Sequence, residues 1–248
     1  MNALTNGATI IVPSTGNEFH TLDDWGLAIG NTNYISEPEQ ETNYIEVPAM
    51  NGFIDLSETL TGRPTFKNRS ISIELGGKRE SMAWDTVISD FRNKIHGRLV
   101  HIIFDNDPSY YWQGRAYVNS FDRMRRLGTF ALEIPQADPY KYELTSSAEP
   151  WLWDPFNFLT GVIRNYGDID VVGSETVDIP AGFMPVTPTF IVSRIQSETF
   201  TVRYKNKTFT LMPGSNYLPE IVINGDEEIS LLFTGTANVI IQYRGGSL

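Results

Sequence analysis

The sequence contains no cysteine, which excludes a disulfide framework, a thiolate zinc site and a cysteine nucleophile. Histidine is scarce: only His20, His96 and His101 occur, and their spacing supports no Ser-His-Asp grouping. Long apolar runs are also missing, since the longest, such as residues 100–104, fall far short of the about 20 residues that a membrane helix needs. Residues 2–7 are polar and lack the basic and apolar regions of a secretory signal. We therefore expect no membrane anchor and synthesis in the cytoplasm.

Motifs for phosphate or metal binding are incomplete. Gly76-Gly77-Lys78 lacks the remaining residues of a phosphate-binding loop. Asp105-Asn106-Asp107 begins like a calcium loop, but Tyr110 stands where the loop needs glycine and Ala116 where it needs a bidentate glutamate. Paired carboxylates such as those of Glu227 and Glu228 are common on exposed turns. We expect no enzymatic activity, no cofactor and no metal.

Basic residues are outnumbered, with 19 Lys and Arg against 30 Asp and Glu, for a net charge of −11. The excess is spread over the chain, which argues against DNA binding because such a surface repels phosphate. Keeping the protein soluble explains the charge equally well. A hydrophobic content of 41% is typical of a globular protein, and 12% aromatic residues suit β-sheets and large contact surfaces.

The first half of the sequence predicts short strands and one helix. Residues 70–75 alternate apolar and polar side chains, which is typical of a half-buried strand, and residues 10–12 and 25–29 also favour strands. Residues 81–96 predict a helix, because apolar side chains recur at spacings of four, three and four, and Gly97 suits its end. Strands over 98–104, 111–118 and 128–134 follow, in the order of an antiparallel meander.

The pattern breaks between residues 136 and 153, and residues 146–150 are typical of a linker. We therefore predict two domains, residues 1–145 and 146–248. The second contains no helix pattern and predicts a β-sandwich, with turns at Gly173-Ser174 and at residues 234–236 between some of its strands. Its expected strands are residues 168–172, 175–179, 189–192, 199–204, 207–211, 217–223, 228–234 and 237–243.

Several segments, taken in order, resemble the distal tail proteins of long-tailed, non-contractile bacteriophages. They are residues 47–62 (VPAMNGFIDLSETLTG), 66–75 (FKNRSISIEL), Trp84 in the helix, 95–97 (IHG), 107–115 (DPSYYWQGR) and 137–142 (ADPYKY). Residues 188–192, 224–225 and 239–244 look like the galectin-like sandwich that ends such proteins, although the likeness there is looser.

The resemblance implies a mainly β chain. It combines an N-terminal tube-protein-like β-sandwich or split barrel with one flanking helix and a C-terminal galectin-like β-sandwich. It also implies a homo-hexameric ring at the distal end of the virion tail. One ring face would join the major tail tube protein and the other the tail-associated protein, while the outer domains hold receptor-binding or baseplate proteins. DNA would only pass through the channel. Six copies would carry a charge of about −66, which prevents the counterion release that makes DNA binding tight.

For such a hub the functional residues are those of its interfaces, and exposed turns and aromatic residues are where contacts are expected. Arg123, Arg125 and Arg126 form the only basic cluster, for which we favour a salt contact between subunits over DNA. Packing within a domain explains every candidate equally well. The candidates are Met50, Asn51, Phe53, Arg63, Phe66, Arg123, Arg125, Arg126, Trp151, Trp153 and Phe156.

Two other functions stay open. The C-terminal sandwich could bind carbohydrate, but galectin-type sugar sites use a histidine and a stacking tryptophan, and residues 154–248 contain neither. A hydrolase with dispersed catalytic residues is the least favoured, because no nucleophile or metal motif is present.

Overall fold

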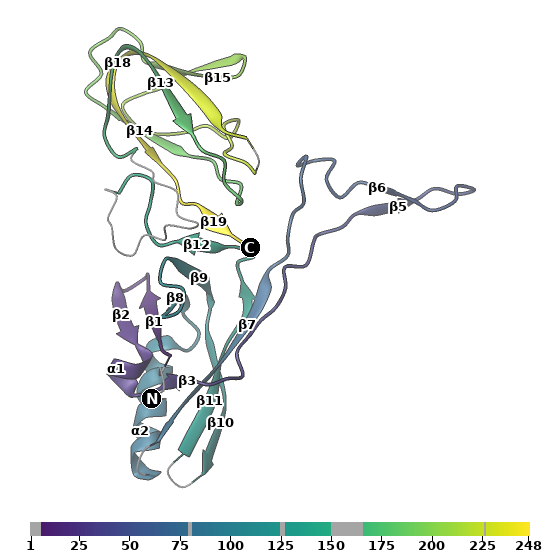
Figure 1. Cartoon of the computed structure of the whole chain (residues 1–248), viewed down its shortest axis with the longest axis vertical. Helices are drawn as coiled ribbons and strands as arrows, with labels where there is room; N and C mark the ends of the chain where they lie inside the picture. Colours follow the sequence, from purple (N-terminus) through teal and green to yellow (C-terminus); the bar gives the residue numbers. More distant parts are fainter. Residues whose placement is uncertain (1–5, 79–80, 125–126, 150–165, 226) are drawn as a thin grey trace. The chain divides into compact units, whose positions relative to one another are not determined.

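The structure is a computed structural model that describes residues 6–78, 81–124, 127–149, 166–225 and 227–248. The chain divides into two compact units (Figure 1). Unit 1 comprises Met1–Asp107 and Tyr111–Lys141, and unit 2 comprises Pro108–Tyr110 and Tyr142–Leu248. Both consist mostly of antiparallel strands, which confirms the predicted mainly β fold class. No described helix is long and apolar enough to cross a membrane.

The first sheet of unit 1 has the strand order β9-β8-β1-β2. Its strands are β1 (Ala8–Val12), β2 (Asn17–His20), β8 (Leu99–Phe104) and β9 (Tyr110–Arg115). The central strands β1 and β8 pair in antiparallel register, with Ile10 opposite Ile102. Both side chains are fully buried, so this sheet presents one apolar face to the core.

The second sheet of unit 1 has the order β10-β11-β7-β3, and β4 also pairs with β7. Alternate residues of β7 face the core: Ile71, Ile73 and Leu75 are buried, as the sequence predicted. The strands are β3 (Ala28–Ile29), β4 (Tyr34–Ile35), β7 (Arg69–Lys78), β10 (Tyr117–Met124) and β11 (Leu127–Ala137).

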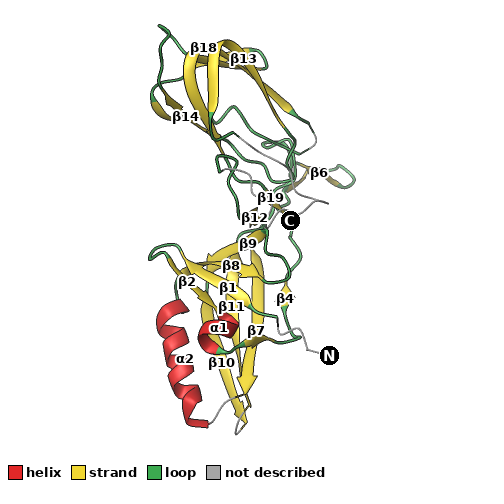
Figure 2. Ribbon diagram, turned by 60° about the vertical axis from the view of Figure 1, so that its left-hand side comes forward, coloured by secondary structure: helices red, strands yellow, loops and turns green. Residues whose placement is uncertain are grey.

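Helix α2 (Ser81–Ile95) confirms the predicted amphipathic helix. Its apolar stripe joins the same core as the two sheets (Figure 2). Trp84 is fully buried, and a Cβ added at Gly128 would lie 2.7–2.8 Å from its indole atoms. Glycine at position 128 therefore makes room for the largest side chain of the helix. Gly97, just beyond the helix, has φ +74, as expected of a residue that follows a helix C-terminus.

A second helix, α1 (Thr21–Trp25), was not predicted. The prediction of a strand over residues 25–29 was wrong in its first part, because Trp25 ends α1 and only Ala28–Ile29 form β3. Gly26 adopts a left-handed conformation with φ 58 and ends the helix. One turn of helix is too short to show a period in the sequence.

Between β4 and β7, residues 39–67 fold back on themselves as a narrow two-stranded ribbon, which we call the arm (Figure 1). β5 (Tyr44–Glu46) pairs with β6 (Phe53–Asp55), and backbone bonds between Glu41 and Thr65 and between Lys67 and Glu39 continue the pairing to the base. All residues from 39 to 55 are exposed.

Unit 2 is one antiparallel sheet built around its longest strand, β18. β13 pairs along the whole of one side of β18, whereas β14 and β15 pair with the two halves of its other side. In the core, Phe190 of β14 and Phe200, just before β15, each contact Phe233 of β18. The strands of this sheet are β13 (Ile169–Ile179), β14 (Thr189–Ser193), β15 (Thr201–Tyr204), β16 (Lys207–Thr210), β17 (Gly214–Tyr217) and β18 (Ile229–Gln242). Two short strands, β12 (Lys141–Glu143) and β19 (Gly246–Ser247), are neighbours outside it.

Two turns predicted in this unit were wrong. Gly173 and Gly235 pair with each other in the middle of β13 and β18, so each of these is one long strand and not two short ones. Both glycines have positive φ, 78 and 118, which lets the paired strands bend without ending. The predicted strand over residues 217–223 was also wrong, because β17 ends at Tyr217.

Candidate assembly interface

Arg69, the first residue of β7, joins the segments that carry the sequence resemblance. Its side chain is 7% exposed, and its Nε and Nη1 donate hydrogen bonds to the carbonyls of Ser36 (2.8 Å) and Pro139 (3.1 Å). The guanidinium carbon lies 4.9 Å from the ring centroid of Trp112. Burial lowers the pKa of this guanidinium. One buried cation therefore holds the base of the arm against two other segments of unit 1.

A second set of polar contacts, among His101, Gln113 and Asp138, links the same segments of unit 1. His101 Nε2 lies 2.9 Å from Gln113 Oε1, and Gln113 Nε2 donates a hydrogen bond of 2.9 Å to Asp138. The ring of His101 also stacks on Tyr111 at 4.3 Å. The residues of the Tyr-Tyr-Trp-Gln and Ala-Asp-Pro-Tyr motifs thus contact one another directly, which explains on structural grounds why they occur together.

The predicted arm residues fall into two groups. Met50, Asn51 and Phe53 are exposed near the tip of the ribbon, where the rings of Phe53 and Tyr44 lie with their centroids 4.4 Å apart. Arg63 and Phe66 are half-buried at its base.

At that base Phe66 contacts the ring of Tyr140 at 6.1 Å. Burial raises the pKa of the Tyr140 hydroxyl, and the charge of Arg63 opposes this shift. The two basal residues therefore make contacts within unit 1, whereas the tip residues leave their apolar surface open.

The remaining candidates lie largely outside the described residues. Arg125, Arg126, Trp151, Trp153 and Phe156 are not described, and of Arg123 only the backbone, in β10, is. The interface role of all the candidates stays a prediction.

Sequence reasoning missed a group of cations beyond the end of α2. Arg92 lies in the last turn of the helix, Arg98 directly precedes β8, and Arg115 ends β9 opposite Leu99, which is 43% exposed. None of the three arginines forms an ion pair with a described side chain. The only signal in the sequence was the absence of a nearby acidic residue at spacings that would pair with them.

The carboxylates of Asp105 and Asp107 bond to other residues of unit 1. Asp105 accepts a hydrogen bond from the backbone of Gly7 at 2.8 Å and lies 3.1 Å from His20, and Asp107 pairs with Lys141 at 2.6 Å. Within the described part of the chain, no group of three or more His, Cys, Asp or Glu side chains could hold a metal ion.

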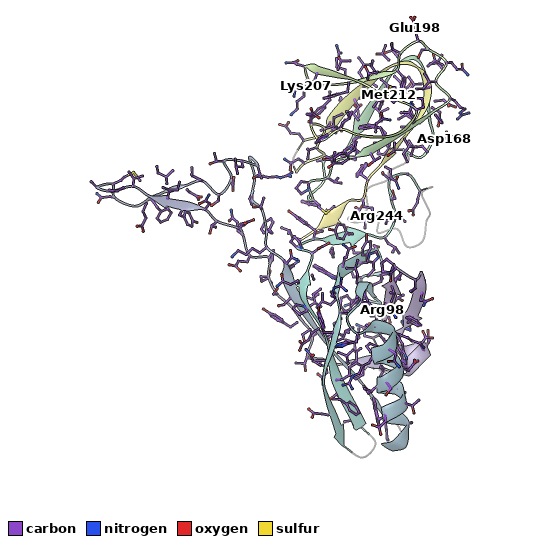
Figure 3. The ribbon with its side chains drawn as sticks, turned by 180° about the vertical axis from the view of Figure 1, so that it is seen from behind. Arg98, Asp168, Glu198, Lys207, Met212 and Arg244 are labelled. Atoms are coloured by element: carbon purple, nitrogen blue, oxygen red, sulfur yellow. The ribbon has the colours of Figure 1, made fainter. Side chains whose placement is uncertain are left out.

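In unit 2, Asp168 and Asp170 share one amide. Asn238 Nδ2 donates to both carboxylates, at 2.6 and 3.0 Å, and Arg194 lies 3.3 Å from Asp170. Asn238 is 5% exposed whereas the carboxylates are exposed, so the group joins β13, β18 and Arg194, which follows β14, at the surface of unit 2. Asp168 of this group is labelled in Figure 3.

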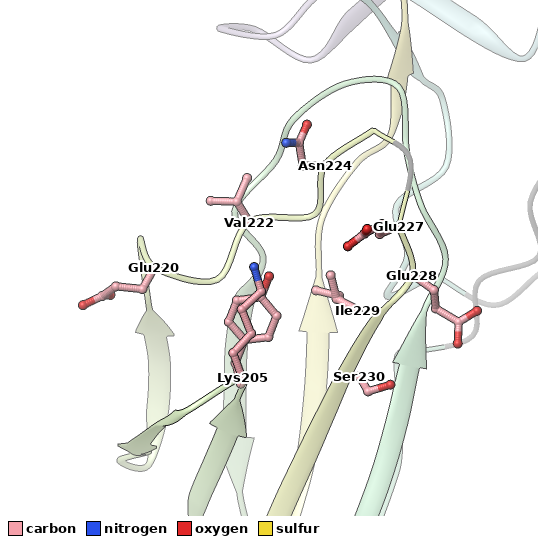
Figure 4. Close-up of a pocket in the computed structure, with 9 residues that line it drawn as sticks. Lys205, Glu220, Val222, Asn224, Glu227, Glu228, Ile229 and Ser230 are labelled. Carbon is pink, nitrogen blue, oxygen red and sulfur yellow. The ribbon is translucent and has the colours of Figure 1, made fainter. Parts of the chain in front are cut away.

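Unit 2 also has an open hollow of about 680 Å³ at the ends of its strands (Figure 4). Tyr204 and Val222 supply its apolar lining, and Glu220, Glu227 and Glu228 make it acidic. Lys205 Nζ lies 5.1 Å from the centroid of the Tyr204 ring. Polar groups beside an aromatic ring are the surroundings in which small polar ligands bind.

Comparison with known proteins gives a fold and no sequence family. No family model matches the chain, and no curated protein matches it. Among solved structures, however, the fold is that of a hub protein from a phage adsorption apparatus.

The similar structure is that of SPP1 Dit (gp 19.1), described as a paradigm of the hub adsorption apparatus in phages that infect Gram-positive bacteria. The two proteins are 13% identical, the match covers 96% of this chain and 98% of the other, and the TM-score is 0.57. This confirms the predicted likeness to distal tail proteins at the level of the fold.

Proposed function

We propose that this chain is a structural hub of a phage tail tip. Six copies form a ring that joins the tail tube to the tail-associated protein and to the receptor-binding or baseplate components, at the distal end of the virion tail. The observation that carries the proposal is the shared fold with SPP1 Dit over 96% of the chain. The exposed apolar arm supports it, because a contiguous apolar surface on a soluble chain is typical of a site for protein contact.

Light scattering after size exclusion, at low and at high protein concentration, tests the ring. A species with the mass of six chains is expected, and electron microscopy of that fraction should show a central hole. A strict monomer at every concentration contradicts self-assembly of the ring, and a stable dimer or tetramer contradicts the six-fold symmetry.

The outward face of β7 and β11 is suited to the wall of a DNA channel. Between the core residues, the middle of these strands presents small or acidic side chains, with Glu74 opposite Ala131 and Glu133 opposite Ser72, whereas Lys78 and Leu127 pair at one end of the strands. A ring of six would place twelve such carboxylates along the channel. Like charge prevents the counterion release that would hold DNA in place. The face comprises Ser70, Ser72, Glu74, Thr129, Ala131 and Glu133.

Reversal of two charges tests this face. Glu74→Lys combined with Glu133→Lys should convert a ring that does not retain duplex DNA into one that binds it, with an affinity that falls as salt rises. The matched control is Glu227→Lys with Glu228→Lys in unit 2, which changes the net charge equally. If both variants bind DNA equally well in an anisotropy titration, net charge is the cause and β7–β11 does not face the channel.

Carbohydrate binding is a second candidate function. It rests on a single observation, the hollow beside Tyr204. A glycan array with the whole chain tests it: binding that Tyr204→Ala abolishes supports a sugar site there. Silence across the array, or binding that the substitution leaves unchanged, removes this candidate.

A further inference from the structure

The dipeptide Asn-Gly occurs three times in the chain, at Asn6-Gly7, Asn51-Gly52 and Asn224-Gly225. An asparagine followed by glycine can modify itself, because the backbone nitrogen of the glycine can attack the side-chain amide carbon of the asparagine. Glycine favours this reaction, since it has no Cβ to shield its nitrogen and its backbone turns readily toward the side chain. The three copies share the same local chemistry, so the fold decides any difference in reactivity between them.

The Asn6-Gly7 copy is held by hydrogen bonds on both sides of its peptide. The carbonyl of Asn6 accepts a hydrogen bond of 2.8 Å from the backbone of Ile29. The nitrogen of Gly7, which is the atom that would attack, donates to Asp105 Oδ2 at 2.8 Å, and the carbonyl of Gly7 accepts from the backbone of Asp105 at 3.2 Å. Gly7 is also buried, and a Cβ added there would lie 2.9 Å from the ring of His20. The attacking nitrogen is therefore both bonded and enclosed.

The Asn51-Gly52 copy is open. It lies in the loop between β5 and β6 at the tip of the arm, and both residues are exposed. Neither the side-chain amide of Asn51 nor the nitrogen of Gly52 forms a hydrogen bond with a described residue. Gly52 has φ +85, and a Cβ added there would meet no atom within 4 Å. The nitrogen of Gly52 is therefore free to approach the side chain of Asn51.

The Asn224-Gly225 copy is open in the same way. Asn224 is exposed on the loop between β17 and β18, where it is one of the residues that line the hollow of unit 2 (Figure 4). Gly225 has φ +45, and a Cβ added there would again meet no atom within 4 Å. The nitrogen of Gly225 donates to no described residue, and the side-chain amide of Asn224 is likewise unbonded within the described part of the chain.

From these observations we infer that Asn51 and Asn224 are sites of spontaneous deamidation, and that the fold protects Asn6 from the same reaction. In each reaction the glycine nitrogen gives up its proton and forms a bond to Cγ of the asparagine, the bond from Cγ to Nδ2 breaks, and ammonia leaves with the proton. Water then opens the cyclic imide at one of its two carbonyl carbons, which yields aspartate or isoaspartate. Water is the only co-reactant, so the reaction needs no enzyme.

Deamidation changes two surfaces of the molecule. Each event replaces a neutral amide by a carboxylate and adds one negative charge to a chain of charge −11. At Asn51 the new charge lies next to the exposed Met50 at the tip of the arm, and at Asn224 it joins the carboxylates that line the hollow of unit 2. Isoaspartate also carries the main chain through the former side chain, which lengthens the backbone of the loop. The inference goes beyond the proposed hub function and does not depend on it.

Peptide mapping by mass spectrometry of the whole chain, kept folded at mildly alkaline pH, tests the inference. Asn51 and Asn224 should convert to a mixture of aspartate and isoaspartate, which chromatography resolves. Asn6 should react at least about 10-fold more slowly, because its hydrogen bonds must open first. The control is the same incubation in guanidinium chloride, where all three copies should react at similar rates. The inference is overturned if Asn6 reacts as fast as the other two in the folded chain, or if either of those stays intact. Aspartate without isoaspartate excludes attack by the glycine nitrogen and overturns it as well.

One substitution should make the protected copy reactive. Asp105→Ala removes the acceptor of the Gly7 nitrogen, so deamidation of Asn6 should rise toward the rate at Asn51. The matched control is Asp107→Ala, because Asp107 is two residues further on but pairs with Lys141 and not with Gly7. Circular dichroism checks that both variants fold. A rate at Asn6 that is the same in the two variants refutes protection by this hydrogen bond.

Discussion

Arg69 provides the sharpest test of how unit 1 is held together. Arg69→Ala removes the donors to the carbonyls of Ser36 and Pro139, which lie in a region where Arg69 is 7% exposed. A buried carbonyl left unpaired costs about 1–3 kcal/mol, and the lost contact with the ring of Trp112 adds about 0.5–2 kcal/mol. Removing the buried charge offsets part of this loss. We expect the free energy of unfolding to fall by about 3 kcal/mol, which lies within the sum of these two ranges.

Tryptophan fluorescence during urea unfolding is the assay. Three of the five tryptophans, Trp25, Trp84 and Trp112, are in unit 1, and the other two, Trp151 and Trp153, are in unit 2, so the larger part of the signal comes from unit 1. Arg69→Lys is the matched variant: it keeps the charge but cannot direct two donors at two carbonyls, so an intermediate loss is expected. A loss below about 0.5 kcal/mol for Arg69→Ala, the size of an ordinary surface substitution, would refute the reasoning.

Two further predictions concern α2. Gly128→Ala places a methyl group 2.7–2.8 Å from the buried indole of Trp84. The midpoint of urea unfolding should therefore fall by the equivalent of about 1–3 kcal/mol. An unchanged midpoint would show that the helix shifts freely to make room for the methyl group. Hydrogen bonds from Lys94 and Trp25 lower the pKa of Asp90 below 3.8. The stabilisation of the fold by the ionised Asp90 is therefore complete above that pH and is lost as the pH falls through the lowered pKa. Asp90→Asn should destabilise by less than about 1 kcal/mol at pH 7, since Asp90 is 43% exposed, and its difference from wild type should shrink toward pH 3. A difference independent of pH would contradict this role.

The elements that the sequence predicted well are those whose signal is local. The period of Trp84, Ile88, Phe91 and Ile95 predicted α2, and the alternation of Ile71, Ile73 and Leu75 predicted β7. Both patterns arise because a helix or strand beside a core must bury one face. The likeness to distal tail proteins also rested on short segments and their order, and the shared fold with SPP1 Dit confirms it.

Glycine misled the prediction where its meaning depends on distant residues. Gly173 and Gly235 read as turns, but each is placed opposite the other across β13 and β18, and together they bend one long pair of strands. A glycine with positive φ ends a strand in one context and bends it in another. Only the pairing of residues about sixty positions apart decides between the two.

The candidate interface divides in the same way. From the sequence alone, Met50, Phe53, Arg63 and Phe66 were equivalent candidates, because composition does not report exposure. The tertiary structure separates them: the first two stand open on the arm, whereas Arg63 and Phe66 lie against Tyr140. Thus the sequence by itself determined a mainly β chain without thiol chemistry, since local periodicity and composition suffice for that. Only tertiary structure decided that Arg69 joins three segments and that the tip of the arm is exposed while Arg63 and Phe66 at its base are half-buried, because those facts depend on which distant residues the fold brings together or keeps apart.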